Sequence, residues 1–228
     1  NCKSIIFTSS IAVYGASEGI EQQKDETTLP MPNTPYGISK LVAEKIHTSW
    51  QMEDVSRRLL IVRPGVIFGA GEKGNVTRMV RGILGNYFVF SGNKQMRKAG
   101  GYVRELCSSI VWMYNQQLQN NQSVVLFNFS MEPTPTLSEY ATAIQQTADR
   151  SRYIPSLPLS VLMMVATGWF LINKLFGRHT DINPARISKL RRSNFIVPKV
   201  LVDSGYQYKY DLRKAMEDWR KELPSDWL

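Results

Sequence analysis

The residues best suited to proton transfer are Tyr36 and Lys40, which lie four positions apart in Thr34-Pro-Tyr-Gly-Ile-Ser-Lys40. Side chains with this spacing share one face of a helix, and Thr34 followed by Pro35 is typical of a helix start. A neighbouring ammonium favours the phenolate and lowers the pKa of a tyrosine from its reference value near ~10. The stretch therefore predicts a tyrosine that acts as general acid and base at neutral pH.

The same spacing occurs a second time, at Tyr210 and Lys214 near the C-terminus. The upstream run 4–15 distinguishes the first pair. It begins as an apolar stretch that leads into Ser9 and Ser10, and a short apolar segment and Gly15 follow. A strand over this run would hold a hydroxyl beside Tyr36. We therefore assign the chemistry to the first pair and interpret the second as an ordinary structural feature.

Three sequence blocks follow one another along the chain. They read Phe-Thr-Ser-Ser-Ile-Ala-Val-Tyr-Gly at 7–15, Pro-Tyr-Gly-Ile-Ser-Lys at 35–40, and Arg-Pro-Gly-Val-Ile-Phe-Gly-Ala-Gly at 63–71. Together they resemble the extended short-chain dehydrogenase/reductase superfamily, the NAD-dependent epimerases and dehydratases. The resemblance implies an enzyme that uses NAD or NADP, an oxidoreductase or isomerase.

The resemblance also implies roles for individual residues. Ser10 would polarise the oxygen of the substrate, Tyr36 would transfer the proton, and Lys40 would lower the tyrosine pKa and hold the nicotinamide ribose. The residues implied at the cofactor are Ser9, Tyr36, Lys40, Pro64 and Val66. Candidate substrate-binding residues are Ser10, Asn75 and Arg97.

The alternation of apolar runs with helical segments predicts an α/β protein. Expected strands cover 4–9, 59–62, 87–90 and 123–129, and expected helices cover 36–53, 75–85, 102–118 and 136–147, the last opening with the capping box Thr-Leu-Ser-Glu. The first helix should pack through a partial apolar face of Leu41, Ala43, Ile46 and Trp50. We expect a Rossmann-like parallel sheet from residues 1–70 and 101–130, with a smaller, mainly helical substrate subdomain from 71–100 and 131–228.

The glycine-rich turn that binds the pyrophosphate in such a fold is not found before Ser4. We therefore expect this chain to lack the N-terminal half and to be inactive alone. The run Gly69-Ala-Gly-Glu-Lys-Gly74 matches Gly-x-Gly-x-x-Gly, but Arg63-Pro64 should interrupt the strand before it, and no acidic residue between Glu72 and Glu105 could hold a ribose. We interpret this loop as leading into the substrate pocket.

The substrate is less closely defined. Arg97, in Gly92-Asn-Lys-Gln-Met-Arg97, and Asn75 match the family positions that bind the diphosphate of a nucleotide sugar. The alternative for Arg97 is a solvated basic cluster with Lys94 and Lys98. A guanidinium suits a diphosphate, so we expect a nucleotide-linked sugar as substrate.

Three departures from the family pattern keep other substrates open. Val66 stands where sugar-nucleotide enzymes usually have an asparagine. The form with valine is also seen in hydroxysteroid- and flavonol-type ketoreductases. Arg104 follows Tyr102-Val103, where an acidic residue is usual, and Ile11-Ala12 stand where a 4,6-dehydratase needs Asp-Glu. A ketoreductase of that type and a truncated, non-catalytic binding module therefore remain as alternatives, whereas a dehydratase is disfavoured.

Composition limits the partners. The 28 lysines and arginines exceed the 19 aspartates and glutamates, but they are scattered apart from 189–192 and lack an aromatic and basic RNA-binding pattern, so we expect no nucleic-acid partner. Cys2 and Cys107, like His47 and His179, are too isolated for a disulfide framework or a metal site. With no signal peptide, the sequence predicts a cytoplasmic protein and, when complete, a homodimer.

The apolar run 159–172 lacks charges but is shorter than the ~20 residues of a membrane span. We expect a helix buried in the substrate subdomain. A helix lying on a membrane surface is the alternative.

Overall fold

The computed structural model describes residues 2–15, 17–18, 22–158, 160–164, 167–168 and 192–228. Its centre is a three-stranded sheet in the order β1 (Ser4–Thr8), β4 (Arg58–Pro64) and β8 (Val124–Phe129). Both strand pairs are parallel, as predicted. The middle strand is apolar and buried on both faces, which is typical of a parallel sheet covered by helices.

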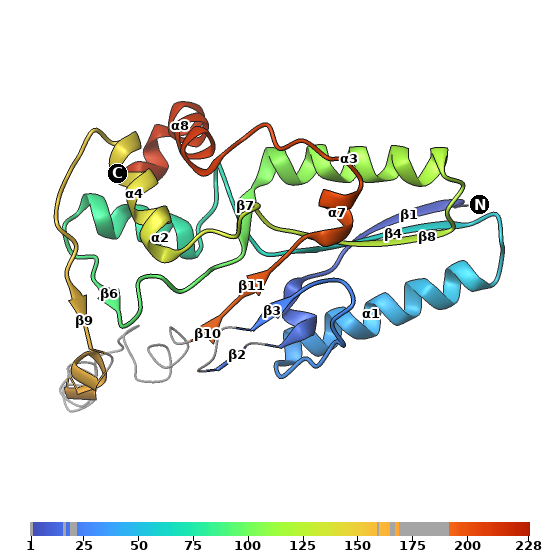
Figure 1. Cartoon of the computed structure of the whole chain (residues 1–228), viewed down its shortest axis with the longest axis horizontal. Coiled ribbons are helices and arrows are strands. Elements are labelled where there is room, and N and C mark those ends of the chain that lie inside the picture. Colours follow the sequence, from blue (N-terminus) through green and yellow to red (C-terminus); the bar gives the residue numbers. More distant parts are fainter. Residues whose placement is uncertain (1, 16, 19–21, 159, 165–166, 169–191) are drawn as a thin grey trace.

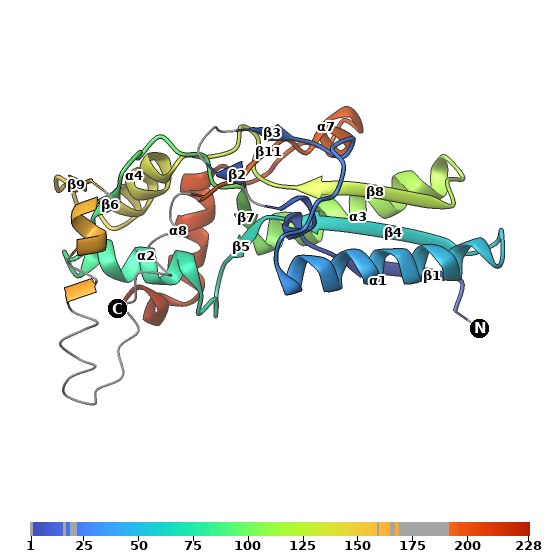
Figure 2. The ribbon, with the colours of Figure 1, turned by 90° about the horizontal axis from the view of Figure 1, so that it is seen from below.

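Helices cover the two faces of this sheet. Helix α1 (Pro35–Met52) lies on one face and α3 (Val103–Gln119) on the other, and the longer α1 connects β1 to β4 (Figures 1 and 2). The five-residue α7 (Lys199–Asp203) contributes Leu201 to the core between β8 and α3. These layers are those of a Rossmann-like fold.

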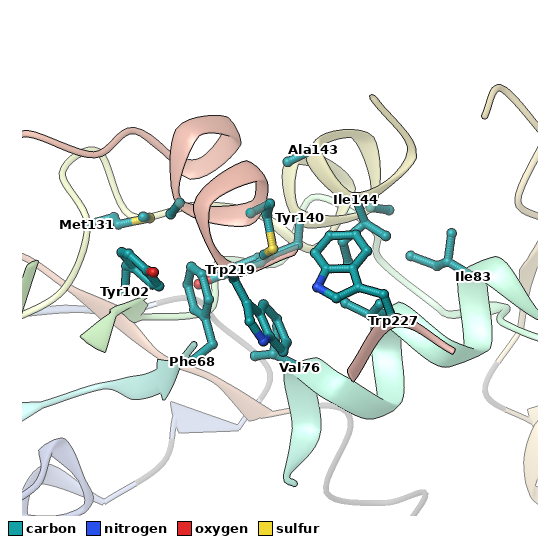
Figure 3. Close-up of a cluster of buried hydrophobic side chains, with 14 of the residues drawn as sticks. Phe68, Val76, Ile83, Tyr102, Met131, Tyr140, Ala143, Ile144, Trp219 and Trp227 are labelled. Atoms are coloured by element: carbon teal, nitrogen blue, oxygen red, sulfur yellow. The ribbon is translucent and has the colours of Figure 1, made fainter. Parts of the chain in front are cut away.

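A second core lies beyond the carboxyl ends of the strands. It is built by α2 (Asn75–Leu84), α4 (Leu137–Thr147), α8 (Leu212–Glu222) and the 3₁₀ helix η3 (Pro224–Trp227). Aromatic rings fill its centre, with Phe68 6.0 Å and Trp227 5.5 Å from the fully buried Trp219 (Figure 3). The indole of Trp219 donates to Asp226 Oδ2 at 2.9 Å, so its one polar atom is satisfied.

Short strand pairs connect distant parts of the chain. Strand β5 (Val66–Phe68) pairs with β7 (Gly100–Tyr102), and β6 (Phe90–Ser91) pairs with β9 (Ser156–Leu157). Strands β10 (Arg192–Ser193) and β11 (Phe195–Ile196) pair with β2 (Ser17–Glu18) and β3 (Gln23–Lys24). The last two pairs bring the C-terminal part of the chain beside the loop that follows β1.

Local signals predicted the helix starts well. The Thr34 hydroxyl accepts from the Gly37 amide at 3.1 Å, and Pro35 is the first helical residue. At α4, Thr136 Oγ1 accepts from the Glu139 amide at 3.1 Å while Glu139 accepts from the Thr136 amide at 2.7 Å. The strand expected over 87–90 is reduced to Phe90 and Ser91.

The prediction that Arg63-Pro64 interrupts the second strand was wrong. Both residues belong to β4, where Arg63 pairs with Asn128 and Pro64 with Phe129. The amides of Leu59 and Gly65 donate toward β8. The backbone N–H groups of the even-numbered residues between them therefore face β1. Strand β1 ends at Thr8, opposite Val62, and the missing N–H of Pro64 therefore removes no ladder hydrogen bond.

The expected apolar contact face of α1 was also only partly right. Leu41 packs against the core, but Ile46 is 63 % exposed. The fully buried positions of α1 are instead Gly37, Glu44 and Gln51. This helix therefore turns a polar row toward the protein.

The apolar run 159–172 is described only in part. Residues 160–164 and 167–168 are helical, and Met164 is 67 % exposed, so the described residues do not support a helix buried in the subdomain. The remainder of the run, like His179, lies outside the described residues. Among the described helices, none combines the length and the apolar character needed to cross a membrane.

Candidate active site

Ser10 lies two residues beyond β1, where it caps the 3₁₀ helix η1 (Ile11–Tyr14). Its hydroxyl accepts from the Ala12 amide at 3.1 Å, and the side chain is half-buried. Gly15 closes this turn with φ at 68°, and a Cβ there would meet the Met31 carbonyl oxygen at 2.4 Å. Only glycine fits this position, so the turn that presents Ser10 is fixed by the local sequence.

Tyr36 and Lys40 lie on one face of α1, as the spacing predicted. The Lys40 ammonium is 5.9 Å from the centre of the Tyr36 ring and 5.3 Å from that of Phe7. It also donates to the Thr8 carbonyl oxygen at 3.0 Å. The phenol belongs to a side chain that is 56 % exposed, so it remains accessible to a ligand.

Helix α1 and the turn that carries Ser10 approach each other closely. A Cβ on Gly37 would meet the Ala12 carbonyl oxygen at 2.4 Å and Pro32 Cβ at 3.0 Å. The glycine between Tyr36 and Ile38 therefore lets η1 rest on the first turn of α1. Ser10, Tyr36 and Lys40 are thereby gathered at the carboxyl edge of the sheet.

A buried ionic network lies behind these three residues. Arg63 donates to both carboxylate oxygens of Glu44, at 2.8 and 2.6 Å, and both side chains are 5 % exposed. Glu44 also accepts from the Ser9 hydroxyl at 2.5 Å, and Arg63 donates to the Tyr14 hydroxyl at 2.8 Å. Sequence reasoning did not find Glu44 or Tyr14, although Glu44 continues the row of Tyr36 and Lys40 by one more turn.

The residues expected at the cofactor occupy one edge of the sheet. The Ser9 hydroxyl points inward to Glu44, so only its main chain remains for a cofactor. Pro64 ends β4 and Val66 begins β5, with the Val66 amide donating to the Ala99 carbonyl oxygen at 2.9 Å. In parallel sheets the carboxyl ends of neighbouring strands share one edge, where ligands bind.

Two charged residues of the loop after β1 are partly or fully buried, which the sequence did not indicate. Lys24 donates to the carbonyl oxygens of Tyr14 at 3.2 Å and Gly15 at 2.8 Å, and burial lowers the pKa of its ammonium. Glu26 accepts from the Asn128 amide at 2.7 Å, and burial raises the pKa of its carboxyl. The second oxygen of Glu26 and the side-chain nitrogen of Asn128 are buried without a protein partner.

The two residues expected to bind the diphosphate, Asn75 and Arg97, lie outside the central sheet and α1. Asn75 is exposed at the start of α2, where it accepts from Arg78 at 2.8 Å. Arg97 is half-buried: it donates to the Thr134 carbonyl oxygen at 2.6 Å and its guanidinium lies 4.9 Å from the centre of the Phe195 ring. Arg97 is therefore not part of a freely solvated basic cluster.

The second Tyr-x-x-x-Lys copy has a different setting. Tyr210 precedes α8 rather than lying in it, and its ring packs 5.0 Å from that of Tyr102. Lys214 pairs with Asp211, the residue that caps α8. The two side chains thus do not share a helix face, which agrees with their interpretation as structural residues.

The acidic residue nearest to Tyr102-Val103 is Glu105, one position after Arg104. Glu105 is fully buried in the first turn of α3, where it accepts from the amides of Tyr210 at 2.9 Å and Lys209 at 3.2 Å. Arg104 instead points to the surface and pairs with Asp218 at 2.8 Å. Glu105 therefore fixes the segment that enters α8.

The loop 69–74 is held by the protein's own side chains. The Gly71 amide donates to Asp226 Oδ2 at 2.8 Å, and Glu72 accepts from the Thr77 amide at 2.8 Å. A carboxylate thus already lies against amides where a dinucleotide turn would place the pyrophosphate. This occupancy agrees with the interpretation that the loop is not a dinucleotide fingerprint.

The remaining candidate ligands stand alone. His47 bonds through Nδ1 to the Ala43 carbonyl oxygen at 2.6 Å and stacks 4.4 Å from Phe7, while Cys2 and Cys107 are exposed thiols. No three histidine, cysteine, aspartate or glutamate side chains gather as a possible metal site among the described residues.

Comparison with known proteins establishes the family. The model of the NAD dependent epimerase/dehydratase family matches residues 1–126, more than half of the chain. The chain belongs to this family. The matched range contains the Ser10 turn, Tyr36, Lys40 and the β4–β5 segment.

Named relatives come from bacteria and plants. An N-acetyl-alpha-D-glucosaminyl-diphospho-ditrans,octacis-undecaprenol 4-epimerase of Escherichia coli O157:H7 is 28 % identical over 94 % of this chain, and the chain spans 63 % of that relative's length. A bifunctional UDP-glucose 4-epimerase and UDP-xylose 4-epimerase of Pisum sativum is 36 % identical over 38 % of this chain and 24 % of its own.

Solved structures support the fold. A human epimerase family protein with NADPH superimposes with a TM-score of 0.68 at 17 % identity, over 97 % of this chain and 66 % of that one. A UDP-glucuronic acid 4-epimerase from Bacillus cereus with NAD gives 0.66 at 14 % identity, over 99 % and 62 %. The Rossmann-like architecture predicted from the sequence is thus confirmed.

Proposed function

We propose that this chain carries the catalytic part of an NAD(P)-dependent epimerase that acts on a sugar linked through a diphosphate, in the first instance to a nucleotide. One observation carries the proposal: Tyr36 and Lys40 project from one face of α1 at the carboxyl edge of the sheet, beside the turn that holds Ser10. The named activities of the relatives support the choice of an epimerase over other reactions of the family.

The edge of the sheet fits a nicotinamide dinucleotide. Lys40 offers an ammonium to the ribose hydroxyls, and the exposed Tyr36 phenol offers a second polar group. The main chain at Ser9, Pro64 and Val66 borders the same edge. When bound, the cofactor supplies a hydride acceptor that can return the hydride to either face of a carbon.

Residues of this chain would transfer the proton of the sugar hydroxyl. Tyr36 removes the proton from a sugar hydroxyl and later returns it, while Ser10 donates a hydrogen bond to the same oxygen. Lys40 places its positive charge beside this phenol, with the ammonium 5.9 Å from the centre of the Tyr36 ring. Loss of the proton from this hydroxyl and of a hydride from its carbon would give a ketone, and return of the hydride to the opposite face, with the proton returned by Tyr36, would invert the configuration of that carbon.

The diphosphate is the recognition element in this proposal. It is shared by UDP-sugars and by the undecaprenol-linked sugar of the Escherichia coli relative, so both carriers serve as probes. We assign its binding to Arg97 and Asn75, from the family pattern. A half-buried guanidinium supported by Phe195 keeps its orientation, which suits a charged hydrogen bond.

Turnover in the complete protein tests the proposal. UDP-glucose and N-acetylglucosaminyl-diphospho-undecaprenol would be supplied separately, and the 4-epimers would be measured. Tyr36→Phe should lower kcat by about 10²–10⁴-fold, the usual contribution of a general acid and base. Lys40→Met should lower kcat and cofactor affinity together.

Tyr210→Phe is the matched control, because it also removes a tyrosine hydroxyl four residues before a lysine. It should leave kcat unchanged. An equal loss in Tyr210→Phe and Tyr36→Phe would show that the wrong pair had been chosen. Reduction of a ketone substrate with consumption of NAD(P)H, without epimerisation, would instead favour a ketoreductase.

Several predictions accompany this proposal. They are the division into a nucleotide-binding part and a substrate subdomain at the boundaries given above, a homodimer, and a cytoplasmic location. A non-catalytic binding module is the outcome if the complete protein binds a nucleotide sugar without turning it over.

A further inference from the structure

We propose that Glu44 is a positioning residue: through Ser9 and Arg63, it sets where Ser10 lies relative to Tyr36 and Lys40. The inference rests on the proposed function, in which these three residues act together. It assigns a role to the buried network that the proton transfer itself does not use.

Three functional side chains form a row on α1. Tyr36, Lys40 and Glu44 are four residues apart, so they follow one another along one face. Lys40 donates to the Thr8 carbonyl oxygen at 3.0 Å, and Glu44 accepts from the Ser9 hydroxyl at 2.5 Å. The helix that carries the phenol thus holds the two residues immediately before Ser10.

The Glu44 carboxylate also holds the turn after Ser10. Arg63 joins Glu44 through two hydrogen bonds and donates a third to the Tyr14 hydroxyl at 2.8 Å. Tyr14 is the last residue of η1, whose first turn is capped by Ser10. Glu44 therefore anchors this turn on both sides, directly through Ser9 and indirectly through Arg63.

Tyr14 extends the connection to the third strand. Its hydroxyl donates to Asn128 Oδ1 at 2.9 Å, and its ring lies 4.9 Å from the Arg63 guanidinium. Helix α1, the end of β1, η1, β4 and β8 are thus joined at one point. These are the elements that surround the candidate active site.

A buried ion pair such as Glu44 and Arg63 affects geometry as well as stability. Removing both charges from water offsets much of their attraction, and well-packed apolar residues of similar volume often stabilise a protein as well. A two-pronged guanidinium and carboxylate contact instead fixes the mutual orientation of both groups. The side chains of Arg63 and Glu44 are each 5 % exposed. We therefore infer that this pair fixes the orientation of the side chains around it more than it stabilises the fold.

Turnover of UDP-glucose by the complete protein provides the first test. The double variant Glu44→Leu/Arg63→Met replaces the pair with apolar side chains and should keep the melting temperature within about 5 °C of wild type. Its kcat should fall about 10- to 100-fold, because a displacement near 1 Å at a reacting group has effects of this size. The KM for UDP-glucose should change less than about threefold, since the Arg97 region is untouched.

Ser9→Ala is the milder variant and covers the case in which the double variant fails to fold. It removes one hydroxyl and leaves the ion pair in place. Its kcat should fall about 3- to 10-fold at unchanged KM. Wild-type kcat in Ser9→Ala, or in a folded double variant, would overturn the inference.

Glu105→Gln is the matched control, because Glu105 is also a buried carboxylate but serves the segment before α8. It should lower the melting temperature and leave the kcat of the folded protein unchanged. Equal losses of kcat in Glu105→Gln and Glu44→Gln would reduce the effect to a general loss of stability and overturn the inference.

Crystal structures of this chain with Ser9→Ala and Glu44→Gln give a test that needs no turnover. The Ser10 hydroxyl should move by about 1 Å relative to the Tyr36 hydroxyl while the register of β1 against β4 is kept. Superimposable positions would overturn the positioning role. Full turnover in Tyr36→Phe would instead overturn the proposed function, whatever the position of Ser10.

Discussion

Gly37→Ala tests the close contact on which the site geometry depends. In most helices this change is stabilising by about 1 kcal/mol, because alanine has the higher helix propensity. Here a Cβ would lie 2.4 Å from the Ala12 carbonyl oxygen, about 1 Å closer than the 3.4 Å at which ordinary van der Waals contacts begin. The partner atom is main chain and cannot rotate away.

The expected magnitude follows from these two opposing effects. Overpacking of a rigid contact costs about 1–3 kcal/mol, which exceeds the gain in propensity. We expect a net loss of about 1–2 kcal/mol in the free energy of unfolding, seen as a fall in melting temperature of about 2–8 °C for a chain of this size. Because η1 must move away from α1, Ser10 should shift and kcat of the complete protein should fall as well.

Thermal and urea unfolding followed by circular dichroism would measure the change. Gly82→Ala is the matched control, since Gly82 also lies inside a helix but its Cβ would meet only side-chain atoms of Phe88 and Tyr87, at 3.3 and 3.4 Å. It should be neutral or slightly stabilising. If Gly37→Ala raised the melting temperature as propensity alone demands, the close contact between η1 and α1 would be refuted.

Further predictions concern charge, binding and capping. Burial raises the pKa of Glu26, so the stability linked to its protonated form is present at low pH and is lost as pH rises through the folded-state pKa. The melting temperature of Glu26→Gln relative to wild type should therefore increase from pH 4 to pH 8, and a constant difference would contradict this. Arg97→Ala should weaken UDP-glucose binding by the complete protein by about 1.5–3 kcal/mol, and unchanged affinity in calorimetry would remove the assignment of the diphosphate to Arg97. Thr136→Ala should lower the free energy of unfolding by about 1 kcal/mol through loss of the capping box, which urea titration would detect. This chain on its own should show no measurable NAD affinity, and saturable binding in calorimetry would mean that the loop 69–74 had been dismissed in error.

Much of the fold could be predicted because its signals are local. The Thr34-Pro35 start of α1, the Thr136 capping box and the apolar run of β4 each depend on a few neighbouring residues. The Tyr36 and Lys40 row follows from helix periodicity alone. Such features are independent of what the distant chain does, and all were read correctly.

The buried charges could not be predicted because their partners are distant. Glu44 lies in a helical sequence that looks exposed, but it is buried against Arg63 of β4 and Ser9, the residue after β1. Lys24 and Glu26 lie in a polar sequence, and distant contacts such as the pairing of β3 with β11 and the hydrogen bond of Glu26 to β8 help to bury them. Single-sequence reasoning assigns such residues to the surface, because an unpaired charge would be costly inside.

The rotation of α1 about its axis favours polar contacts over apolar burial. The helix carries an apolar row of Ile38, Val42 and Ile46, each about half exposed or more, while Gly37, Glu44 and Gln51 face the protein. Burying an aliphatic side chain is worth about 1.5–3 kcal/mol, so the exposed row forgoes apolar burial within the described residues. A rotation of α1 that buried this row would turn Lys40 and Glu44 away from their hydrogen-bond partners Thr8 and Ser9. The observed rotation therefore keeps these contacts and leaves the apolar row on the surface.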